Sequence, residues 1–360
     1  MAKRILLLIT DLEIGGTPTV VRELATRLRP YAHLEVICLK KWGPVADQLR
    51  ECGVATTALG ASRAWHLPGV VRRLRAIIVE RKIDTLFSFL AHANTVASVA
   101  LGGCPGVRGL QSIQTVQPAP RWHWRVQGWV SDRAEKFVVP STAIVRVASE
   151  RSGIAPERCI VIPNAVDPAS YEQMSVFSGQ VARVGYIGRL DPAKQPELLV
   201  EMMHFADEST ELHYFGDGRA RQSIERAARQ TSARSRIVLH GTVGGDGVGP
   251  QAALARLDCL MLPSKVEGFG LVLIEAMAAG VPVIAVDAGG VRDVVTTGEN
   301  GLLIPPGGDR ATAELFARAL ATLRSDAALR DRLIAGGLKT VHDKFSWDRV
   351  LPQYRALLGV

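Results

Sequence analysis

The strongest constraint on the fold of this 360-residue chain is a twice-repeated alternation of short apolar runs with longer helical patterns. The apolar runs of the first half predict strands near 4–9, 34–39, 84–89, 107–113, 135–139 and 159–162. Helical stretches separate them, at 18–29, 67–81, 92–101, 121–131 and 141–151. The second half predicts strands near 182–187, 211–215, 236–240, 258–262, 282–286 and 301–304. Apolar strands that alternate with helices are typical of parallel sheets covered on both faces.

Two such alternations indicate two doubly wound α/β domains in tandem. The polar segment from Asp167 to Gln180 is the expected linker, since it contains Pro168 and Gly179. We therefore expect an N-terminal domain over 1–168 and a C-terminal domain over 180–345. The final stretch, 346–360, has a helical pattern but no strand to follow, so we expect it to cross back and pack on the first domain.

Composition and cysteine usage predict a cytoplasmic protein. The chain is 47% hydrophobic, yet no apolar run approaches the roughly 20 residues that span a bilayer. The apolar run from Ile5 to Ile9 is too short for a signal-peptide core and is interpreted as the first strand. The five cysteines are scattered, with no C-x-x-C spacing, which favours reduced thiols over a zinc site or a disulfide framework.

The formal net charge of +8 is concentrated in the first half. Up to Asp167 there are 22 basic and 13 acidic residues, against 21 and 22 in the remainder. This excess fits either solvated, arginine-rich helix faces or a first domain that meets an anionic surface or substrate. Nucleic acid is not an expected partner, because no DNA- or RNA-binding module is recognisable.

The clearest chemical motif is EGFGLVLIE at 267–275, which follows an apolar strand and opens a helix. Gly268 and Gly270 allow a ligand to approach the backbone, and the free N–H groups of a helix start favour phosphate oxygens. Glu275 falls one turn into the helix, where a carboxylate can accept hydrogen bonds from a ribose diol. Glu267 lies on the loop, toward a reacting sugar. The alternative interpretation is a tight turn with two solvated glutamates.

A second motif, VGYIGRLDPAKQPELL at 184–199, carries Arg189 and Lys194 between a strand that ends at Gly188 and a helix predicted to start near Pro196. Two cations there could stabilise a departing diphosphate, whose negative charge grows as the sugar bond breaks. The alternative is a basic loop without a ligand. Both motifs follow strands of one parallel sheet, and ligands bind at the carboxyl ends of such strands.

These two motifs, the IPNAVD sequence at 162–167 and the early Gly15-Gly16 pair together resemble the family-four glycosyltransferases. The resemblance covers essentially the whole chain. It implies the GT-B fold, in which two Rossmann-like domains face each other across a cleft. It also implies a nucleotide-diphosphate sugar donor, retention of anomeric configuration, and no metal or other cofactor.

The resemblance also implies roles for particular residues. Arg189 and Lys194 would hold the diphosphate, Glu275 the ribose, and Glu267 the donor sugar. The other implied donor-binding positions are Gly15, Gly16, Gly188, Gly268, Phe269, Gly270 and Leu271.

Gln114 marks a departure from the family pattern, which has a histidine after the fifth strand of the first domain. The matching segment is QSIQTVQ at 111–117. Glutamine can hydrogen-bond a sugar hydroxyl but cannot shuttle protons near neutral pH. Gln114 remains our candidate for this catalytic position. His92 is a second candidate for lining the same region, although a buried core histidine is the favoured interpretation.

Two helical segments bear on membrane contact. Residues 67–81 place an apolar stripe beside three arginines, and 121–129 gather three tryptophans with two arginines, so that Trp122, Arg125 and Trp129 share a face. Such patterns suit an anionic membrane interface. The favoured interpretation of each segment is core packing with solvated arginines. The alternative expectation is a cytoplasmic protein in peripheral contact with the inner face of the membrane.

The predicted function is a retaining hexosyltransferase of polysaccharide biosynthesis. It would move a sugar from a nucleotide-diphosphate donor, with a UDP-sugar favoured, to a glycan, lipid-linked or small-molecule acceptor. The alternatives are a nucleotide-sugar epimerase of the same architecture and a nucleotide-sugar-binding pseudoenzyme, the latter suggested by Gln114. The transferase is preferred because both cations and both glutamates are present. DLEIGG lacks the full G-x-G-x-x-G spacing of a dinucleotide-dependent oxidoreductase.

Overall fold

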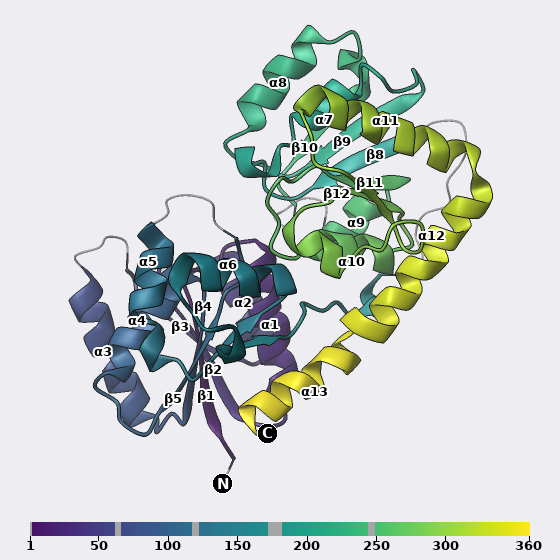
Figure 1. Ribbon diagram of the computed structural model, residues 1–360. Coiled ribbons are helices and arrows are strands. Elements are labelled where there is room, and N and C mark those ends of the chain that lie inside the picture. Colours follow the sequence, from purple (N-terminus) through teal and green to yellow (C-terminus); the bar gives the residue numbers. More distant parts are fainter. Residues whose placement is uncertain (1, 62–65, 117–121, 172–181, 244–248) are drawn as a thin grey trace. The chain divides into compact units, whose positions relative to one another are not determined.

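A computed structural model of the chain describes residues 2–61, 66–116, 122–171, 182–243 and 249–360 (Figure 1). The chain forms two compact units. The first comprises Met1–Asn164 together with Val350–Val360, and the second comprises Ala165–Arg349. Most of the expected linker, 172–180, lies outside the described residues. Each unit is built on its own parallel sheet, which confirms the predicted pair of Rossmann-like α/β folds.

The first unit contains a seven-stranded parallel sheet in the order β3-β2-β1-β4-β5-β6-β7. Its strands are β1 (Arg4–Ile9), β2 (His33–Cys38), β3 (Ala55–Ala58), β4 (Thr85–Phe89), β5 (Arg108–Ser112), β6 (Lys136–Val139) and β7 (Cys159–Val161). The strand order reverses between β1 and β4, the place where ligands bind in sheets of this kind. β3 was not predicted, because this half-exposed edge strand has the sequence ATTA and lacks an apolar run.

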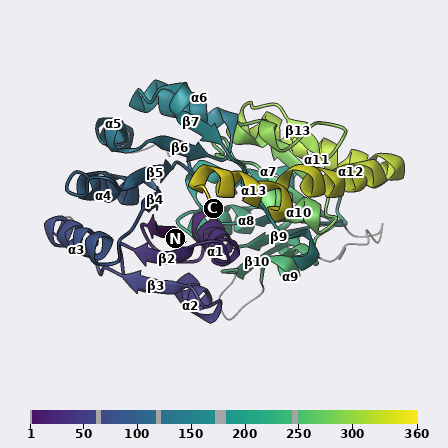
Figure 2. The same ribbon diagram turned by 90° about the horizontal axis from the view of Figure 1, so that it is seen from below.

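Helices cover both faces of the first sheet. They are α1 (Gly16–Leu28), α2 (Pro44–Glu51), α3 (Leu67–Glu80), α4 (Ala91–Leu101), α5 (Trp122–Trp129), α6 (Thr142–Ser152) and α13 (Trp347–Leu358). Figure 2 shows α3, α4 and α5 along one face, with α1 and α13 against the other. The Tyr354 ring lies 6.4 Å from that of Phe87, and Lys3 Nζ donates to the Leu358 carbonyl at 2.9 Å. The prediction that the C-terminal helix packs on the first domain is therefore confirmed.

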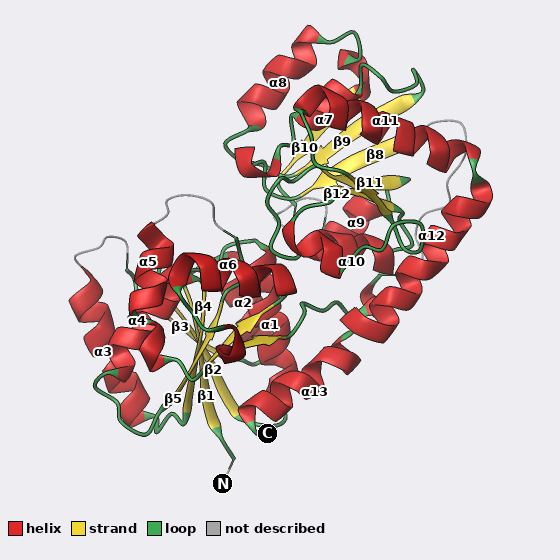
Figure 3. Ribbon diagram, viewed as in Figure 1, coloured by secondary structure: helices red, strands yellow, loops and turns green. Residues whose placement is uncertain are grey.

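The second unit contains a six-stranded parallel sheet in the order β10-β9-β8-β11-β12-β13. Its strands are β8 (Ala182–Ile187), β9 (Thr210–Phe215), β10 (Ile237–Gly241), β11 (Cys259–Leu262), β12 (Val283–Val286) and β13 (Leu302–Ile304). Its helices are α7 (Leu198–Met202), α8 (Arg221–Gln230), α9 (Pro250–Leu254), α10 (Leu271–Ala278), α11 (Asp309–Ser325) and α12 (Ala327–Thr340). Figure 3 shows α7 and α11 over one face of the sheet and α9 and α10 against the other.

The segment after β8 differs from its prediction. The helix expected near Pro196 begins at Leu198, and Pro192–Lys194 forms a separate 3-10 turn. Asp191 causes this turn, because its side chain accepts a hydrogen bond from the Ala193 backbone N–H at 3.1 Å. Lys194 therefore lies on a capped turn that precedes the helix.

The arginine-flanked stripe of α3 is part of the core. Val70, Val71, Leu74 and Ile78 are all buried, and Arg75 Nε donates to the Ala100 carbonyl at 3.1 Å. Core packing is thus the correct interpretation for this segment, and its apolar face is not available to a membrane. None of the helices in the described parts of the chain is both long and apolar enough to span a bilayer.

The tryptophan segment is divided between core and solvent. Trp124 is buried, whereas Trp122 and Trp129 are 54% and 83% exposed on α5. Arg125 is exposed as well, while Arg121 lies outside the described residues. The predicted shared face of Trp122, Arg125 and Trp129 is therefore open to solvent.

Candidate functional site

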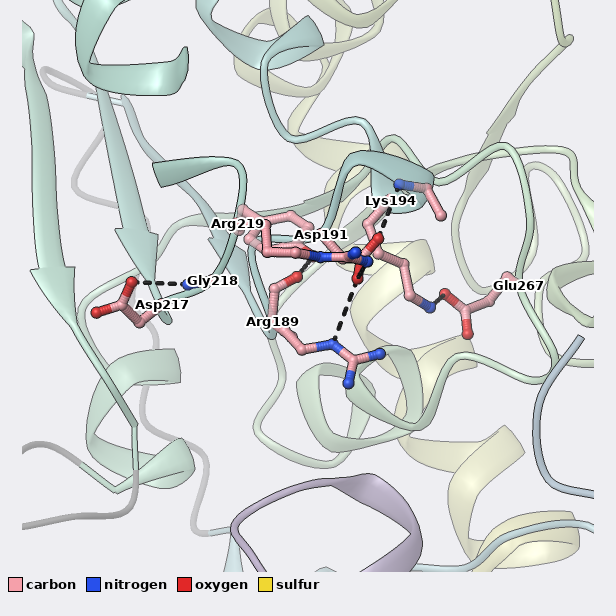
Figure 4. Close-up of polar contacts among 9 residues, drawn as sticks. Arg189, Asp191, Lys194, Asp217, Gly218, Arg219 and Glu267 are labelled. Atoms are coloured by element: carbon pink, nitrogen blue, oxygen red, sulfur yellow. Dashed lines mark hydrogen bonds and ion pairs between the residues drawn. The ribbon is translucent and has the colours of Figure 1, made fainter. Parts of the chain in front are cut away.

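Loops from two adjacent strands of the second sheet bring Lys194 and Glu267 together. β8 pairs with β11, and the segments that follow them carry these two residues. Lys194 Nζ donates to a carboxylate oxygen of Glu267, and the side chains are 29% and 11% exposed (Figure 4). The two sequence motifs therefore converge on one partly buried ion pair.

Arg189 follows the same strand but extends into solvent. Gly188 precedes it with φ of 142°, a conformation that disfavours a side chain. The Tyr186 hydroxyl donates to the Arg189 carbonyl at 2.8 Å, which fixes the backbone of the loop. The Arg189 side chain is 77% exposed, and its Nε lies 3.8 Å from Asp191 Oδ2. Its guanidinium is thus anchored at one end and accessible at the other.

A third loop, which sequence reasoning missed, reaches the same place from β9. A Cβ on Gly216 would lie 1.9 Å from the Gly188 carbonyl oxygen, and one on Gly218 would lie 2.4 Å from that of Leu190. Only glycine permits this backbone contact, which brings the next residue, Arg219, over the loop after β8. Arg219 Nη2 donates to Asp191 Oδ2 at 2.9 Å. The signal that could have found it is F-G-D-G-R at 215–219, directly after a predicted strand.

Asp191 connects the two arginines (Figure 4). One carboxylate oxygen accepts from the Ala193 N–H, and the other meets Arg219 and Arg189. Burial raises the pKa of Asp191, but the hydrogen bonds from Arg219 and Ala193 and the nearby positive charges outweigh it, so that the pKa is lowered overall. Asp191 is consequently ionised at neutral pH.

The backbone of Glu267 is fixed by a fourth loop, which follows β12. Gly289 has φ of +52°, and a Cβ there would lie 2.3 Å from the Glu267 carbonyl oxygen. The neighbouring Gly290 N–H donates to that oxygen at 2.9 Å. The A-G-G sequence at 288–290 was the available signal, and it was not used.

The glycine-rich loop before α10 has the backbone conformation of a helix start, and it buries the side chain of one predicted donor-binding residue. Gly270 adopts φ of +90° at the helix start, which glycine tolerates best, and Leu271 opens the helix. The Phe269 side chain is only 2% exposed, and its ring lies 5.5 Å from that of Phe345. Phe269 can therefore offer a ligand its backbone but not its side chain.

Glu275 lies one turn into α10, as predicted. Burial raises its pKa to about 7, although a hydrogen bond with Tyr171 opposes the shift. The group thus changes its protonation state near neutral pH. Tyr171 is a partner that the sequence did not suggest.

The first unit holds the other predicted residues, and one interpretation is wrong. Gln114 is 7% exposed, and its Nε2 donates to Ser112 Oγ at 2.8 Å. His92 is exposed in the first turn of α4, with its ring 5.2 Å from that of His123, so it is not a core histidine. His92 lies beyond the carboxyl end of β4, and partial burial together with the neighbouring His123 lowers its pKa. Gly15 and Gly16 lie at the start of α1, where Gly15 is the N-cap.

Comparison with known proteins identifies the family. The family described as Glycosyltransferase Family 4 matches residues 14–170, and Glycosyl transferases group 1 matches 172–340. The GDP-mannose-dependent alpha-mannosyltransferase of Mycolicibacterium smegmatis is 31% identical, over 81% of this chain and 81% of that protein. The phosphatidyl-myo-inositol mannosyltransferase of Mycobacterium leprae is 30% identical, over 81% of this chain and 77% of that protein. The chain belongs to the group 1, family 4 glycosyltransferases.

Other relatives match over a smaller part of their length. The chain spans 38% to 55% of four further curated glycosyltransferases, among them D-inositol 3-phosphate glycosyltransferases. Among solved structures, Anabaena HepE in complex with UDP-glucose has a TM-score of 0.87 at 19% identity and is matched over 99% of both chains. This likeness confirms the predicted GT-B architecture of two Rossmann-like domains.

Proposed function

We propose that the chain is a retaining hexosyltransferase that uses a nucleotide-diphosphate sugar, with a UDP-sugar favoured. The observation that carries this proposal is the convergence of Arg189, Lys194 and Glu267 at the carboxyl ends of β8 and β11. Cleavage of the sugar–phosphate bond adds negative charge to the departing diphosphate. Fixed cations at that position stabilise the transition state more than the ground state, which is what catalysis requires.

The residues divide the work in this proposal. Arg189 and Lys194 bind the diphosphate, and the backbone from Gly268 to Leu271 completes the phosphate cradle. Glu267 orients the Lys194 ammonium and has a second carboxylate oxygen with which to accept from a sugar hydroxyl. Glu275 accepts hydrogen bonds from the ribose when it is ionised.

Two relatives point to different donor bases. The UDP-glucose complex of Anabaena HepE supports a UDP-sugar, whereas the mannosyltransferase of Mycolicibacterium smegmatis is named as GDP-mannose-dependent. We propose that neither a metal nor another cofactor is required, because the two side-chain cations can supply the charge that a metal would otherwise provide.

The first unit is proposed to face the acceptor. Gln114 would hydrogen-bond a sugar hydroxyl, and Gly15 and Gly16 would contribute to binding at the end of β1. The acceptor would be a glycan, a lipid-linked sugar or a small molecule of cytoplasmic polysaccharide biosynthesis. Trp122 and Trp129 are the exposed residues that would bring the enzyme to the inner face of the membrane.

The test begins with thermal-shift measurements of the full chain against UDP-, GDP- and ADP-sugars. The sugar that gives the largest shift is then assayed for transfer and hydrolysis, with and without EDTA. NMR spectroscopy of the product reports whether the anomeric configuration is retained. A stable protein that is shifted by none of the donors would contradict the proposal. Complete loss of turnover in EDTA would contradict its metal-independent part alone.

A further inference from the structure

The charges that converge in the second unit balance to zero unless Arg219 is included. Arg189 and Lys194 are matched by two carboxylates, Asp191 and Glu267, each in contact with one of them. A nucleotide-diphosphate sugar carries about two negative charges and the free nucleoside diphosphate about three, because a terminal phosphate has its second pKa near 6. A cluster of zero net charge is poorly suited to bind either. Arg219 makes the cluster positive.

Arg219 is also held in a way that fold stability does not explain. Its side chain is 81% exposed, and exposed ion pairs add little to stability. Its backbone position nevertheless depends on two glycines, Gly216 and Gly218, whose replacement would cause clashes with the neighbouring loop. The contact with Asp191 uses one terminal nitrogen. A guanidinium has five N–H donors in a planar fork, which suits a phosphate group.

Three further charges beside this loop, on Asp217, Arg221 and Glu225, sum to one negative charge, but they pair with one another and not with the cluster. Asp217 accepts from the Gly218 N–H at 2.7 Å and lies 3.4 Å from Arg221 Nη1, so that its charge is matched within its own loop and helix. Arg221 also pairs with Glu225 at 2.9 Å. Arg219 is thus the cation that the described residues add to the cluster in Figure 4.

We propose that Arg219 is a third cation of the donor site, which binds the diphosphate directly, and that Asp191 is a positioning residue that holds Arg219 beside Arg189. This inference rests on the proposed function, because it assumes a nucleotide-diphosphate donor in the second unit. Since the released nucleoside diphosphate carries more charge than the donor, Arg219 favours the departing group over the intact donor.

A purely electrostatic shielding role for Arg219 is the competing explanation. In that case the arginine only neutralises Asp191, and its removal weakens nucleotide binding because an unmatched carboxylate then repels the phosphates. The two roles differ in an Asp191→Asn background. The substituted amide can still accept from the Ala193 N–H, as the capping geometry requires, but it carries no charge to shield.

The test is calorimetric titration of the full chain with UDP, GDP and ADP, continued with the nucleotide that binds most tightly. Arg219→Ala is expected to weaken binding about tenfold, the scale for one charge-assisted contact. The control Arg226→Ala removes the same charge from a position on α8 outside the cluster. This control is expected to change the affinity less than about twofold, because solvent and salt screen distant charges. In the Asp191→Asn background, Arg219→Ala is expected to weaken binding by about threefold, less than in wild type because Arg219 has lost the carboxylate that positions it, but more than the control variant.

Two results would overturn the inference while leaving the proposed function intact. One is loss of the Arg219→Ala effect in the Asp191→Asn background, which would assign Arg219 to shielding. The other is an equal effect of Arg219→Ala and Arg226→Ala, which would reflect net charge alone. Failure of the folded wild-type chain to bind UDP, GDP or ADP would instead count against the proposed function, and the inference would fall with it.

Discussion

The two parallel sheets carry different polar chemistry at their carboxyl ends. In the first unit a neutral network is sealed in the core: Asn94 Nδ2 donates to the Ser112 carbonyl and to Gln127 Oε1, both at 3.1 Å. Gln127 in turn donates to Gln111 at 2.6 Å, and all these side chains are buried. In the second unit, a charged cluster has its arginines open to solvent; its members are Arg189, Asp191, Lys194, Arg219 and Glu267.

The two units share one architecture, but the buried amide network contributes to stability and the charged cluster to ligand binding and chemistry. Buried amides that satisfy each other fix a unique packing, and each is costly to remove because its partners are left unpaired. Exposed charges contribute little to folding and are retained for what they bind. We therefore expect substitutions in the first network to change stability, and those in the second cluster to change donor binding and turnover.

The largest effect is expected from the cations of the second unit. Lys194→Ala and Arg189→Ala should each lower turnover by at least about a hundredfold, the scale for removing an electrostatic stabiliser of a transition state. Arg226→Ala is the matched control and should leave turnover within about twofold. The measurement is initial-rate kinetics with the donor chosen by thermal shift. Near wild-type turnover in both variants would mean that the cluster is not the reaction site.

In the first unit, substitution in the buried amide network should lower stability and leave nucleotide binding unchanged. Asn94→Ala leaves the partners of a buried amide unsatisfied and should lower the free energy of unfolding by about 2 to 3 kcal/mol. Thr95→Ala, which removes only a local hydrogen bond to the Ala91 carbonyl, should cost less than about 1 kcal/mol.

Denaturant titration measures both changes, and calorimetry with the nucleoside diphosphate measures binding. The affinity should stay unchanged in Asn94→Ala, because the proposed diphosphate contacts lie in the other unit. If Asn94→Ala lost much affinity and little stability, the buried amide network would have to be assigned to ligand binding and not to stability.

Local patterns predicted most of the fold but only part of the site. Strands such as β1 and β8 were found because they are continuous apolar runs, whereas β3 lacks one. Glu267 and Lys194 were found because each lies in a compact motif. The contact between Asp191 and Arg219, and that between Glu267 and Gly289, join loops far apart in the chain. Such pairings depend on strand order, which periodicity does not encode.

Glu275 offers a smaller, pH-dependent test within the second unit. Because its folded pKa is raised from 4.5 to about 7, its contribution to stability is present below about pH 4.5 and is lost as the pH rises through about 7. Binding should change in the opposite direction, since only the ionised carboxylate accepts two ribose hydroxyls well. The affinity for the nucleoside diphosphate should rise by up to about tenfold between about pH 6 and 8.

Glu275→Gln is the control for this prediction. The variant should bind more weakly than wild type at about pH 8, and its affinity should follow only the titration of the nucleotide itself. Its melting temperature should fall less than that of wild type between about pH 5 and 7. Parallel pH profiles of wild type and variant, for both binding and melting, would show that Glu275 does not titrate in this range.

The smallest effect is expected in membrane binding by the exposed residues of the first unit. The basic excess up to Asp167 and the exposed Trp122 and Trp129 suit weak binding to an anionic membrane, whereas the apolar stripe of α3 is buried and cannot contribute. A basic residue close to such a surface contributes about 1 kcal/mol, screened within a Debye length, so binding should weaken sharply with salt. In vesicle co-sedimentation, a fraction of the wild-type protein should stay bound at high salt, as a salt-resistant remainder. The double variant Trp122→Ser, Trp129→Ser should lose this fraction.

Trp42→Ser is the matched control for the tryptophans. Trp42 is 37% exposed, lies outside α5, and donates from its indole N–H to Asp47 at 2.8 Å. Its loss should leave the salt-resistant remainder intact, since only the α5 tryptophans are expected to insert among the lipids. Absence of sedimentation with both anionic and neutral vesicles at low salt would remove the membrane from the proposal. The acceptor would then have to be sought among dissolved glycans and small molecules, and the basic excess of the first unit would be explained by solvated helix faces alone.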